Sequence, residues 1–335
     1  MLLRVLGTAA GGGIPQWNCA CPGCSGARRD PRWRRRHASL AVRASDGTDW
    51  YVVNAGPDLT DQLEDAPPLR PGPGRSSPVA GVVLTDAELD HTLGLARLRE
   101  ADALRVHATA PVRGALTAGL RLGAVLAPYL ELTWTDLGPD HRPLSPTRPT
   151  VPGGSGGSGG SGGGLRIAAV PVSAKRPRYA AGLDIAPDTV PGMLPEGDQD
   201  GGPGGGPGPG AWVSALSVRD PVTGGSLLYA PALGSWPEEL QRAAERADCV
   251  IVDGTFWDDD EPVRTGISAR TATGMGHLPI TGPGGTAERL GKLSARCLYT
   301  HLNNTNPLVD PAAPQHRLLA EQGLEVASDG MEIEL

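Results

Sequence analysis

The sequence has few aromatic residues and no long hydrophobic run. Phe, Trp and Tyr together make up 4% of the 335 residues, with a single Phe, so a folded core must consist mainly of Leu, Val and Ala. No run is long enough to span a bilayer, and residues 1–7 lack the basic region and cleavage site of a secretory signal. The net charge of −7 argues against a nucleic-acid-binding protein, which usually has a basic face. We therefore expect a cytoplasmic protein that binds neither membranes nor nucleic acid.

Three of the five cysteines lie within six residues, at Cys19, Cys21 and Cys24. Thiolates this close repel each other unless a cation lies between them, and a tetrahedral Zn²⁺ is the usual cation. The alternatives are a disulfide or a group of inert buried thiols. A zinc ion held by three thiolates and a fourth protein ligand has no open position for a substrate, so we expect this zinc to be structural. Such a cluster suits a reducing cytoplasm, and Cys249 and Cys297, in apolar runs, are expected to be buried and inert.

Short apolar runs alternate with helical spacings along the chain. Strands are predicted at residues 2–6, 40–42, 50–53, 81–84, 165–170, 212–218, 227–229, 249–252 and 297–300. Helices are predicted at residues 91–101, 110–126, 237–247, 284–293 and 314–322. Because the strands come in groups that look antiparallel, with helices between some of them, we expect an α/β fold with two sheets sandwiched between helices.

Two stretches are too rich in Gly, Ser and Pro to pack into a core. They lie at 152–164, a Gly/Ser repeat, and at 191–210, which is mostly Gly and Pro with acidic residues. Neither is flanked by a change of pattern that would mark a new domain. We interpret both as flexible loop insertions within one domain, residues 1–335, because long surface insertions cost little loop entropy.

Four residues able to bind a metal ion follow the apolar run that ends at Leu84. They are Asp86, Glu88, Asp90 and His91, at the start of a predicted helix. In an extended backbone the three alternating carboxylates would lie on one face, where they repel each other without a cation. Capping of the helix start explains one or two acidic residues, but not all three together with the histidine.

Two further strands end in polar residues that could join the same site. The run 250–252 is followed by Asp253, and the run 297–300 is followed by His301. A lone histidine is more often a structural residue than a ligand. Positions at the ends of apolar strands favour a functional role, because sites are assembled there.

These residues carry a resemblance to the metallo-β-lactamase superfamily. Asp86-x-Glu88-x-Asp90-His91 resembles its strand–(His-x-His-x-Asp-His)–helix motif, with the first two histidines replaced. More closely, the whole chain resembles the family of B proteins of pyrroloquinoline quinone (PQQ) biosynthesis. The matching stretches are 11–18 with the three cysteines, 84–91, 252–257, 275–279, 301–307 and 329–335. The resemblance implies the αββα four-layer sandwich of the metallo-β-lactamase fold.

The resemblance also implies which metal ligands are kept. Superfamily members with two zinc ions use histidines for the first ion where this chain has Asp86 and Glu88; their third histidine falls near Lys175, and their bridging aspartate near residues 231–232. Asp90, His91 and His301, the set for the second ion, remain. Two imidazoles and one carboxylate form the facial triad of non-haem Fe(II) enzymes, with positions open for O₂ and substrate.

The function implied is an iron-dependent hydroxylase. Its substrate would be the tyrosine ring of a Glu–Tyr unit released from a small precursor peptide, and other PQQ biosynthesis proteins are potential partners. Asp86, Glu88 and Asp253 would orient ligands, move protons or bind a second ion, and Lys175 could bind substrate carboxylates. Two other hypotheses are a carrier that hands PQQ or its precursor on toward export to the periplasm, and a zinc hydrolase. The hydrolase is disfavoured because carboxylate ligands reduce the Lewis acidity of zinc.

The fourth ligand of the structural zinc is left open. In a phosphodiesterase branch of the superfamily, a histidine three positions after the last active-site histidine completes the zinc shell. Here that position is Asn304, and asparagine is a poor zinc ligand. His277, His301 or a water molecule are the alternatives.

Overall fold

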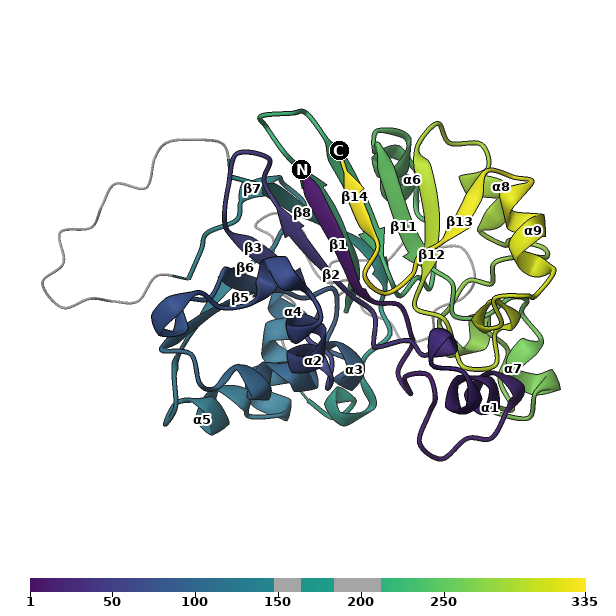
Figure 1. Ribbon diagram of the computed structural model, residues 1–335, viewed down its shortest axis with the longest axis horizontal. Helices are drawn as coiled ribbons and strands as arrows, with labels where there is room; N and C mark the ends of the chain where they lie inside the picture. The colour runs from purple at the N-terminus through teal and green to yellow at the C-terminus, as the bar shows by residue number, and fades with distance from the viewer. Residues whose placement is uncertain (148–163, 184–211) are drawn as a thin grey trace, which may run out of the picture.

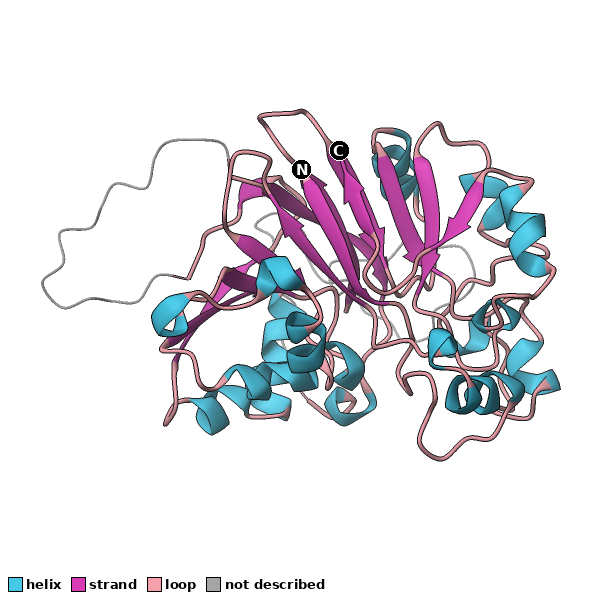
Figure 2. Ribbon diagram, viewed as in Figure 1, coloured by secondary structure: helices cyan, strands magenta, loops and turns pink. Residues whose placement is uncertain are grey.

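The computed structural model describes residues 1–147, 164–183 and 212–335, and their strands form two seven-stranded sheets packed between helices (Figures 1 and 2). The first sheet has the order β14 (Glu332–Glu334), β1 (Leu2–Gly7), β2 (Ser39–Arg43), β3 (Trp50–Val53), β4 (Val79–Val83), β5 (Ala103–Ala108), β6 (Glu131–Asp136). The second has the order β13 (Leu324–Val326), β12 (Arg296–Thr300), β11 (Cys249–Asp253), β10 (Ser226–Ala230), β9 (Val213–Arg219), β8 (Arg166–Ser173), β7 (Arg142–Pro143).

Helices cover the outer faces of both sheets. Figure 1 shows α2 to α5 grouped at the left of the molecule and α7 to α9 at the right. Their bounds are α1 (Pro22–Arg29), α2 (Leu59–Glu64), α3 (Leu89–Thr92), α4 (Ala110–Gly114), α5 (Leu122–Leu126), α6 (Glu238–Glu245), α7 (Glu261–Arg264), α8 (Ala287–Leu290) and α9 (Gln315–Ala320). This layering confirms the predicted αββα fold. No described helix is both long enough and apolar enough to cross a membrane.

Three hydrophobic clusters follow the layers of the fold. One lies between the sheets and includes Leu3 and Leu216; the other two lie under the helices, around Leu95 of the first half and Leu240 of the second. They consist mainly of Leu, Val and Ala, with few aromatic side chains, as the composition predicts. Rigid packing on both faces of each sheet fixes the strand ends from which the functional side chains project.

The sheets are mixed rather than antiparallel, which corrects the strand pairing expected from sequence. Strands β3 to β6 are parallel to one another, and so are β10 to β13; the remaining pairs are antiparallel. Strands β5, β6, β7, β13 and β14 were not predicted; β7, β13 and β14 are only two or three residues long, whereas β5 and β6 do alternate apolar with polar residues and were overlooked. Parallel strands place their carboxyl ends at one edge of each sheet. The residues after β4 lie at that edge of the first sheet, and those after β11 and β12 at that edge of the second.

Three predicted helices are much shorter than their spacing suggests, and the one expected at 284–293 is only α8, Ala287–Leu290. The helix expected at 91–101 is α3 followed by a 3₁₀ turn at Leu93–Leu98. Gly94 causes the break: its amide donates to the carbonyl of Ala55 at 2.8 Å, and a Cβ there would lie 2.1 Å from the carbonyl oxygen of Gly56. The helix expected at 110–126 is divided by a π turn. The predicted insertions at 152–164 and 191–210 lie outside the described residues, apart from Gly164, and the single-domain assignment stays a prediction.

Candidate functional site

Asp90, His91 and His301 converge at the edge of the sandwich, from two different sheets. Asp90 and His91 lie in α3, just after β4, and His301 directly follows β12. Their candidate ligand atoms all lie within 4.8 Å of one another. Asp90 Oδ2 is 3.5 Å from His301 Nε2 and 3.8 Å from His91 Nε2. The structure therefore brings together the three residues that the superfamily motif indicates.

Each imidazole is fixed through its Nδ1 atom, which leaves Nε2 for the shared centre. His91 Nδ1 lies 2.7 Å from Asp86 Oδ2, and His301 Nδ1 lies 2.8 Å from Thr255 Oγ1. His91 Nε2 is buried and has no hydrogen-bond partner. A buried nitrogen without a partner is unfavourable in a folded protein, so this atom fits the role of a metal ligand whose tautomer is set by the bond at Nδ1.

Asp86 lies behind His91 rather than among the candidate ligands. It accepts hydrogen bonds from Thr85 Oγ1 at 2.6 Å and from the amide of Glu88 at 2.9 Å. The carboxylates of Asp86 and Asp90 approach different nitrogens of the His91 ring, so the expected single face of three carboxylates is not formed. The reason is local: the chain bends at Thr85 and becomes helical at Leu89, which ends the extended alternation.

Asp253 anchors a second histidine beside His301. It is fully buried and accepts hydrogen bonds from the amides of Leu233 and Thr255, each at 2.9 Å. His277 Nδ1 lies 2.7 Å from Asp253 Oδ2, and the rings of His277 and His301 stack with centroids 5.8 Å apart. From the sequence, His277 was considered only as a ligand for the zinc of the cysteines. It lies on an irregular loop, and its one signal was the stretch 275–279 shared with the family.

The charges around the two ligand histidines favour a cation. Burial alone would raise the pKa of Asp90, but the imidazoles of His91 and His301 outweigh it and hold that pKa below its ordinary value. Burial would lower the pKa of His91, but Asp86 and Asp90 outweigh it and raise the pKa. Burial would also lower the pKa of His301, but Asp253 and Asp90 outweigh it and raise that pKa to about 10. A site that stabilises two positive imidazolium rings is equally suited to one divalent metal ion.

A pocket of about 520 Å³ opens onto these residues. Its walls include Glu88, His277 and Phe256, and exposed cationic side chains gather on one part of it, namely Lys175, Arg176, Arg178 and Arg270. Burial, followed by the nearby charge of Asp86, raises the pKa of Glu88, which Lys175 partly offsets. Ala232, near the predicted position of the bridging aspartate, also lines the pocket and offers no ligand atom. The pocket thus combines a candidate metal centre with a cationic wall.

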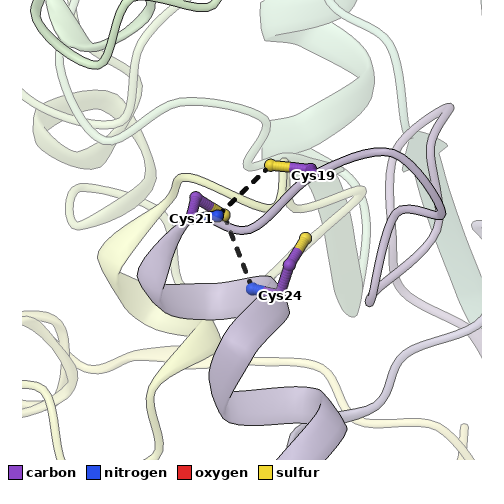
Figure 3. A group of neighbouring side chains, drawn as sticks. All are labelled: Cys19, Cys21 and Cys24. Atoms are coloured by element: carbon purple, nitrogen blue, oxygen red, sulfur yellow. Dashed lines mark hydrogen bonds between the residues drawn. The ribbon is translucent and has the colours of Figure 1, made fainter.

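The three cysteines form a second, separate centre. Their sulfurs lie within 4.8 Å of one another, with Cys19 in the loop before α1 and Cys24 in its first turn (Figure 3). Cys21 caps α1 and accepts a hydrogen bond from the amide of Cys24, drawn as a dashed line in Figure 3. Burial raises the pKa of the Cys21 thiol to about 11, helped by the neighbouring thiols of Cys19 and Cys24 and opposed by the backbone amide of Cys24. A metal ion must displace that proton to bind here.

Asn304 is the residue that faces the cysteines. Its Nδ2 lies 3.1, 3.4 and 3.3 Å from the sulfurs of Cys19, Cys21 and Cys24. The other two residues considered for the fourth ligand, His277 and His301, line the pocket and contact Asp253 instead. Asn304 is therefore the described side chain that contacts all three sulfurs, but it does so through a donor nitrogen, and the fourth ligand of a zinc ion here stays open.

Comparison with known proteins identifies the family to which the chain belongs. Residues 49–302 match the model of the beta-lactamase superfamily domain. The chain is 40% identical to coenzyme PQQ synthesis protein B of Azoarcus sp. (strain BH72) and 40% identical to that of Cupriavidus necator, with 99–100% of each chain covered. It belongs to the PqqB family. A Zn²⁺-bound crystal structure of PqqB from Methylobacterium extorquens superposes with a TM-score of 0.79, 29% identity and full coverage of both chains.

In this PqqB family member, a substitution at Asp86 tests whether that carboxylate orients the ring of His91 for metal binding. Asp86→Asn removes the negative charge behind His91 while keeping the side-chain size. We expect the affinity of the pocket for a divalent ion to fall about 10–100-fold, because a residue that orients a ligating histidine typically contributes that much. Metal titration followed by calorimetry measures the change. Glu88→Gln, which removes a pocket carboxylate outside the candidate ligand group, is the matched control; equal losses in both variants would contradict this role.

Glu261, at the start of α7, gives a prediction on the pH dependence of stability. Its buried carboxylate accepts hydrogen bonds from the amide of Trp257 and from Thr305 Oγ1, each at 2.6 Å. Burial raises the pKa of Glu261 to about 7, against an ordinary value of 4.5. The folded state therefore holds this proton more tightly than the unfolded state. The resulting stabilisation is complete below pH 4.5 and is lost as pH rises through about 7.

Glu261→Gln should remove that dependence. Between pH 5 and pH 8 we expect the wild-type protein to lose about 3 kcal/mol of unfolding free energy that the variant does not lose. Urea denaturation at a series of pH values measures the difference. The exposed Glu100→Gln variant should behave like the wild type, and parallel curves for all three proteins would show that Glu261 is ionised normally.

Proposed function

We propose that this PqqB family member acts in PQQ synthesis as an Fe(II)-dependent hydroxylase of the tyrosine ring in a Glu–Tyr unit derived from a precursor peptide. The observation that carries this proposal is the convergence of Asp90, His91 and His301, with the buried Nε2 atom of His91 left without a partner. Two imidazoles and one carboxylate are the ligand set of non-haem Fe(II) oxygenases. Once bound, the iron would supply the activation of O₂.

The residues around the candidate ligands support a metal-binding role. Asp86 keeps the proton of His91 on Nδ1, and Thr255 and Asp253 do the same for His301. Both Nε2 atoms then keep a lone pair for the metal ion. His301 has a φ of 59°, in the left-handed region that is uncommon for residues other than glycine. Such conformations persist where the surroundings impose them, and they occur often at functional sites.

The pocket supports a small substrate that carries carboxylates and an aromatic ring. Its volume of about 520 Å³ lies within the range usual for ligand pockets, roughly 300–1,000 Å³. Lys175 and Arg270 can pair with carboxylates, and Phe256 offers an apolar contact for a ring. The imidazole of His277, held at Nδ1 by Asp253, presents its other nitrogen for hydrogen bonding to a phenol.

The experiment that tests the function compares two metals. The protein is purified without oxygen, loaded with Fe(II) or Zn(II), and supplied with a Glu–Tyr dipeptide, O₂ and a small-molecule reductant. The reductant is needed because hydroxylation by O₂ takes up two further electrons and releases the second oxygen atom as water. We expect O₂ consumption and a hydroxylated ring with iron only. Equal activity with zinc, or none with iron, would refute the hydroxylase.

A carrier for PQQ or its precursor is the second candidate, favoured by the cationic wall of the pocket. Tight binding of PQQ without turnover of any peptide would support it. A zinc hydrolase is the third, since a relative was crystallised with Zn²⁺. Asp86 and Glu88 argue against it, and introducing histidine at both positions should then create hydrolysis rather than abolish it.

A further inference from the structure

A second cleft, of about 280 Å³, lies between α6 and the outer face of strands β8 and β9. Its floor includes the small apolar side chains of Ala168 and Val170, together with Ser217. Arg242 and Arg246 from the α6 side and Arg219 at the end of β9 form part of its wall. None of its lining residues lines the metal pocket, so the cleft is a distinct feature of the molecule.

The positive charge of this cleft is only partly balanced. Arg242 pairs with Glu238 at 3.3 Å and with Glu239 at 3.2 Å; Glu239 is the one carboxylate among the lining residues. Arg219 and Arg246 form no ion pair with any carboxylate in the part of the chain that the structure describes. Two guanidinium groups at this cavity therefore have no ion-pair partner of their own, since Glu239 pairs with Arg242, in a protein whose net charge is −7.

His141 lies close to the arginines of this cleft. Its Nε2 lies 3.1 Å from Ser217 Oγ, and Arg166 Nη2 donates to its backbone carbonyl at 2.6 Å. Burial lowers the pKa of His141, and the positive charges of Arg219, Arg166 and Arg246 lower it further, opposed by Asp140. An imidazole, a serine hydroxyl and several guanidinium groups thus surround one small space that has an apolar floor.

We propose that this cleft binds a small organic oxyanion, a phosphate ester or a carboxylate, whose charged group pairs with Arg219 and Arg246. Guanidinium groups form paired hydrogen bonds with the oxygens of either anion. The Ser217 hydroxyl can add a further hydrogen bond, and Ala168 and Val170 can contact an apolar body. The site is independent of the metal centre and of the function proposed for it.

The test uses the full-length protein with inorganic phosphate, phenyl phosphate and benzoate as probes. Binding is followed by calorimetry and by the NMR titration of the His141 ring, assigned with a His141→Gln variant. We expect bound anion to raise the pKa of His141, because it offsets the neighbouring arginines. The double variant Arg219→Ala/Arg246→Ala should bind at least about tenfold more weakly, since two charge-assisted contacts are lost.

The matched control is Arg75→Ala/Arg121→Ala. These arginines are also exposed and also form no ion pair among the described residues, so the control loses the same charge elsewhere. It should bind as the wild type does. Tighter binding of phenyl phosphate or of benzoate assigns the anion class. The proposal fails if both double variants respond alike, or if chloride at equal ionic strength shifts the His141 titration as far as the probes do.

Discussion

His91→Ala is expected to lose one metal ion and more than about a hundredfold of its activity while it keeps the fold. The loss should exceed the 10–100-fold effect typical of residues that only orient a ligand, because His91 would itself be a ligand. The variant leaves Asp86 buried without its imidazole partner, which should cost about 1–3 kcal/mol of stability. Metal analysis, O₂ consumption and circular dichroism together measure the three effects.

His107→Ala separates ligand loss from the loss of a buried histidine. His107 is 1% exposed, like His91, and its Nε2 contacts the backbone carbonyl of Ser145, away from the metal centre. We expect this variant to be destabilised but to keep both metal ions. If His91→Ala retained the wild-type metal content, or if His107→Ala lost the same ion, the proposed ligand set would be wrong.

Cys21→Ala is expected to lose a zinc ion and much of the stability of its half of the molecule. The three cysteines and Asn304 connect the loop before α1 to the chain that follows β12. Structural zinc contributes about 10–16 kcal/mol in small zinc-finger peptides. Here three hydrophobic clusters also hold the fold, so we expect a loss of several kcal/mol, visible as a lower melting temperature.

Cys249→Ala is the matched control for the removal of a thiol. Cys249 is fully buried in β11, and burial raises the pKa of its thiol to about 12, so it is expected to be inert. This variant should lose about 1 kcal/mol from packing and no zinc. A chelator should lower the melting temperature of the wild type and of Cys249→Ala, but not that of Cys21→Ala. A Cys21→Ala protein with unchanged zinc content would refute the site.

The candidate ligand residues could be predicted from the sequence because they occupy strand ends. His301 and Asp253 each follow an apolar run, and Asp90 and His91 follow another, so the fold and these positions could be anticipated together. The separate roles of Asp86 and Asp90 could not, because alternation in the sequence assumes an extended chain and this one turns into a helix. His277 was missed for a related reason: its loop turns at Gly276, with a φ of 89°, and has no periodicity to interpret.

Neither the cationic wall of the metal pocket nor the cleft beside α6 could be predicted from the sequence. Lys175 was proposed from its place in the superfamily pattern, whereas Arg270 lies almost a hundred residues further along the chain and joins it only in the fold. Arg219 and Arg246 come from a strand end and from the end of α6, and neither belongs to a motif. Convergence of this kind depends on tertiary packing, which local patterns do not encode.

Only two residues separate His301, in the pocket, from Asn304, at the cysteines. The intervening amide of Asn303 donates to the carbonyl of Thr255 at 3.1 Å, which restrains the position of this short segment. Occupancy of the two centres should consequently be cooperative, since zinc at the thiolates would immobilise the backbone that carries the unfavourable φ of His301. Because such coupling is reciprocal, an ion bound in the pocket should strengthen the binding of zinc at the cysteines by the same factor.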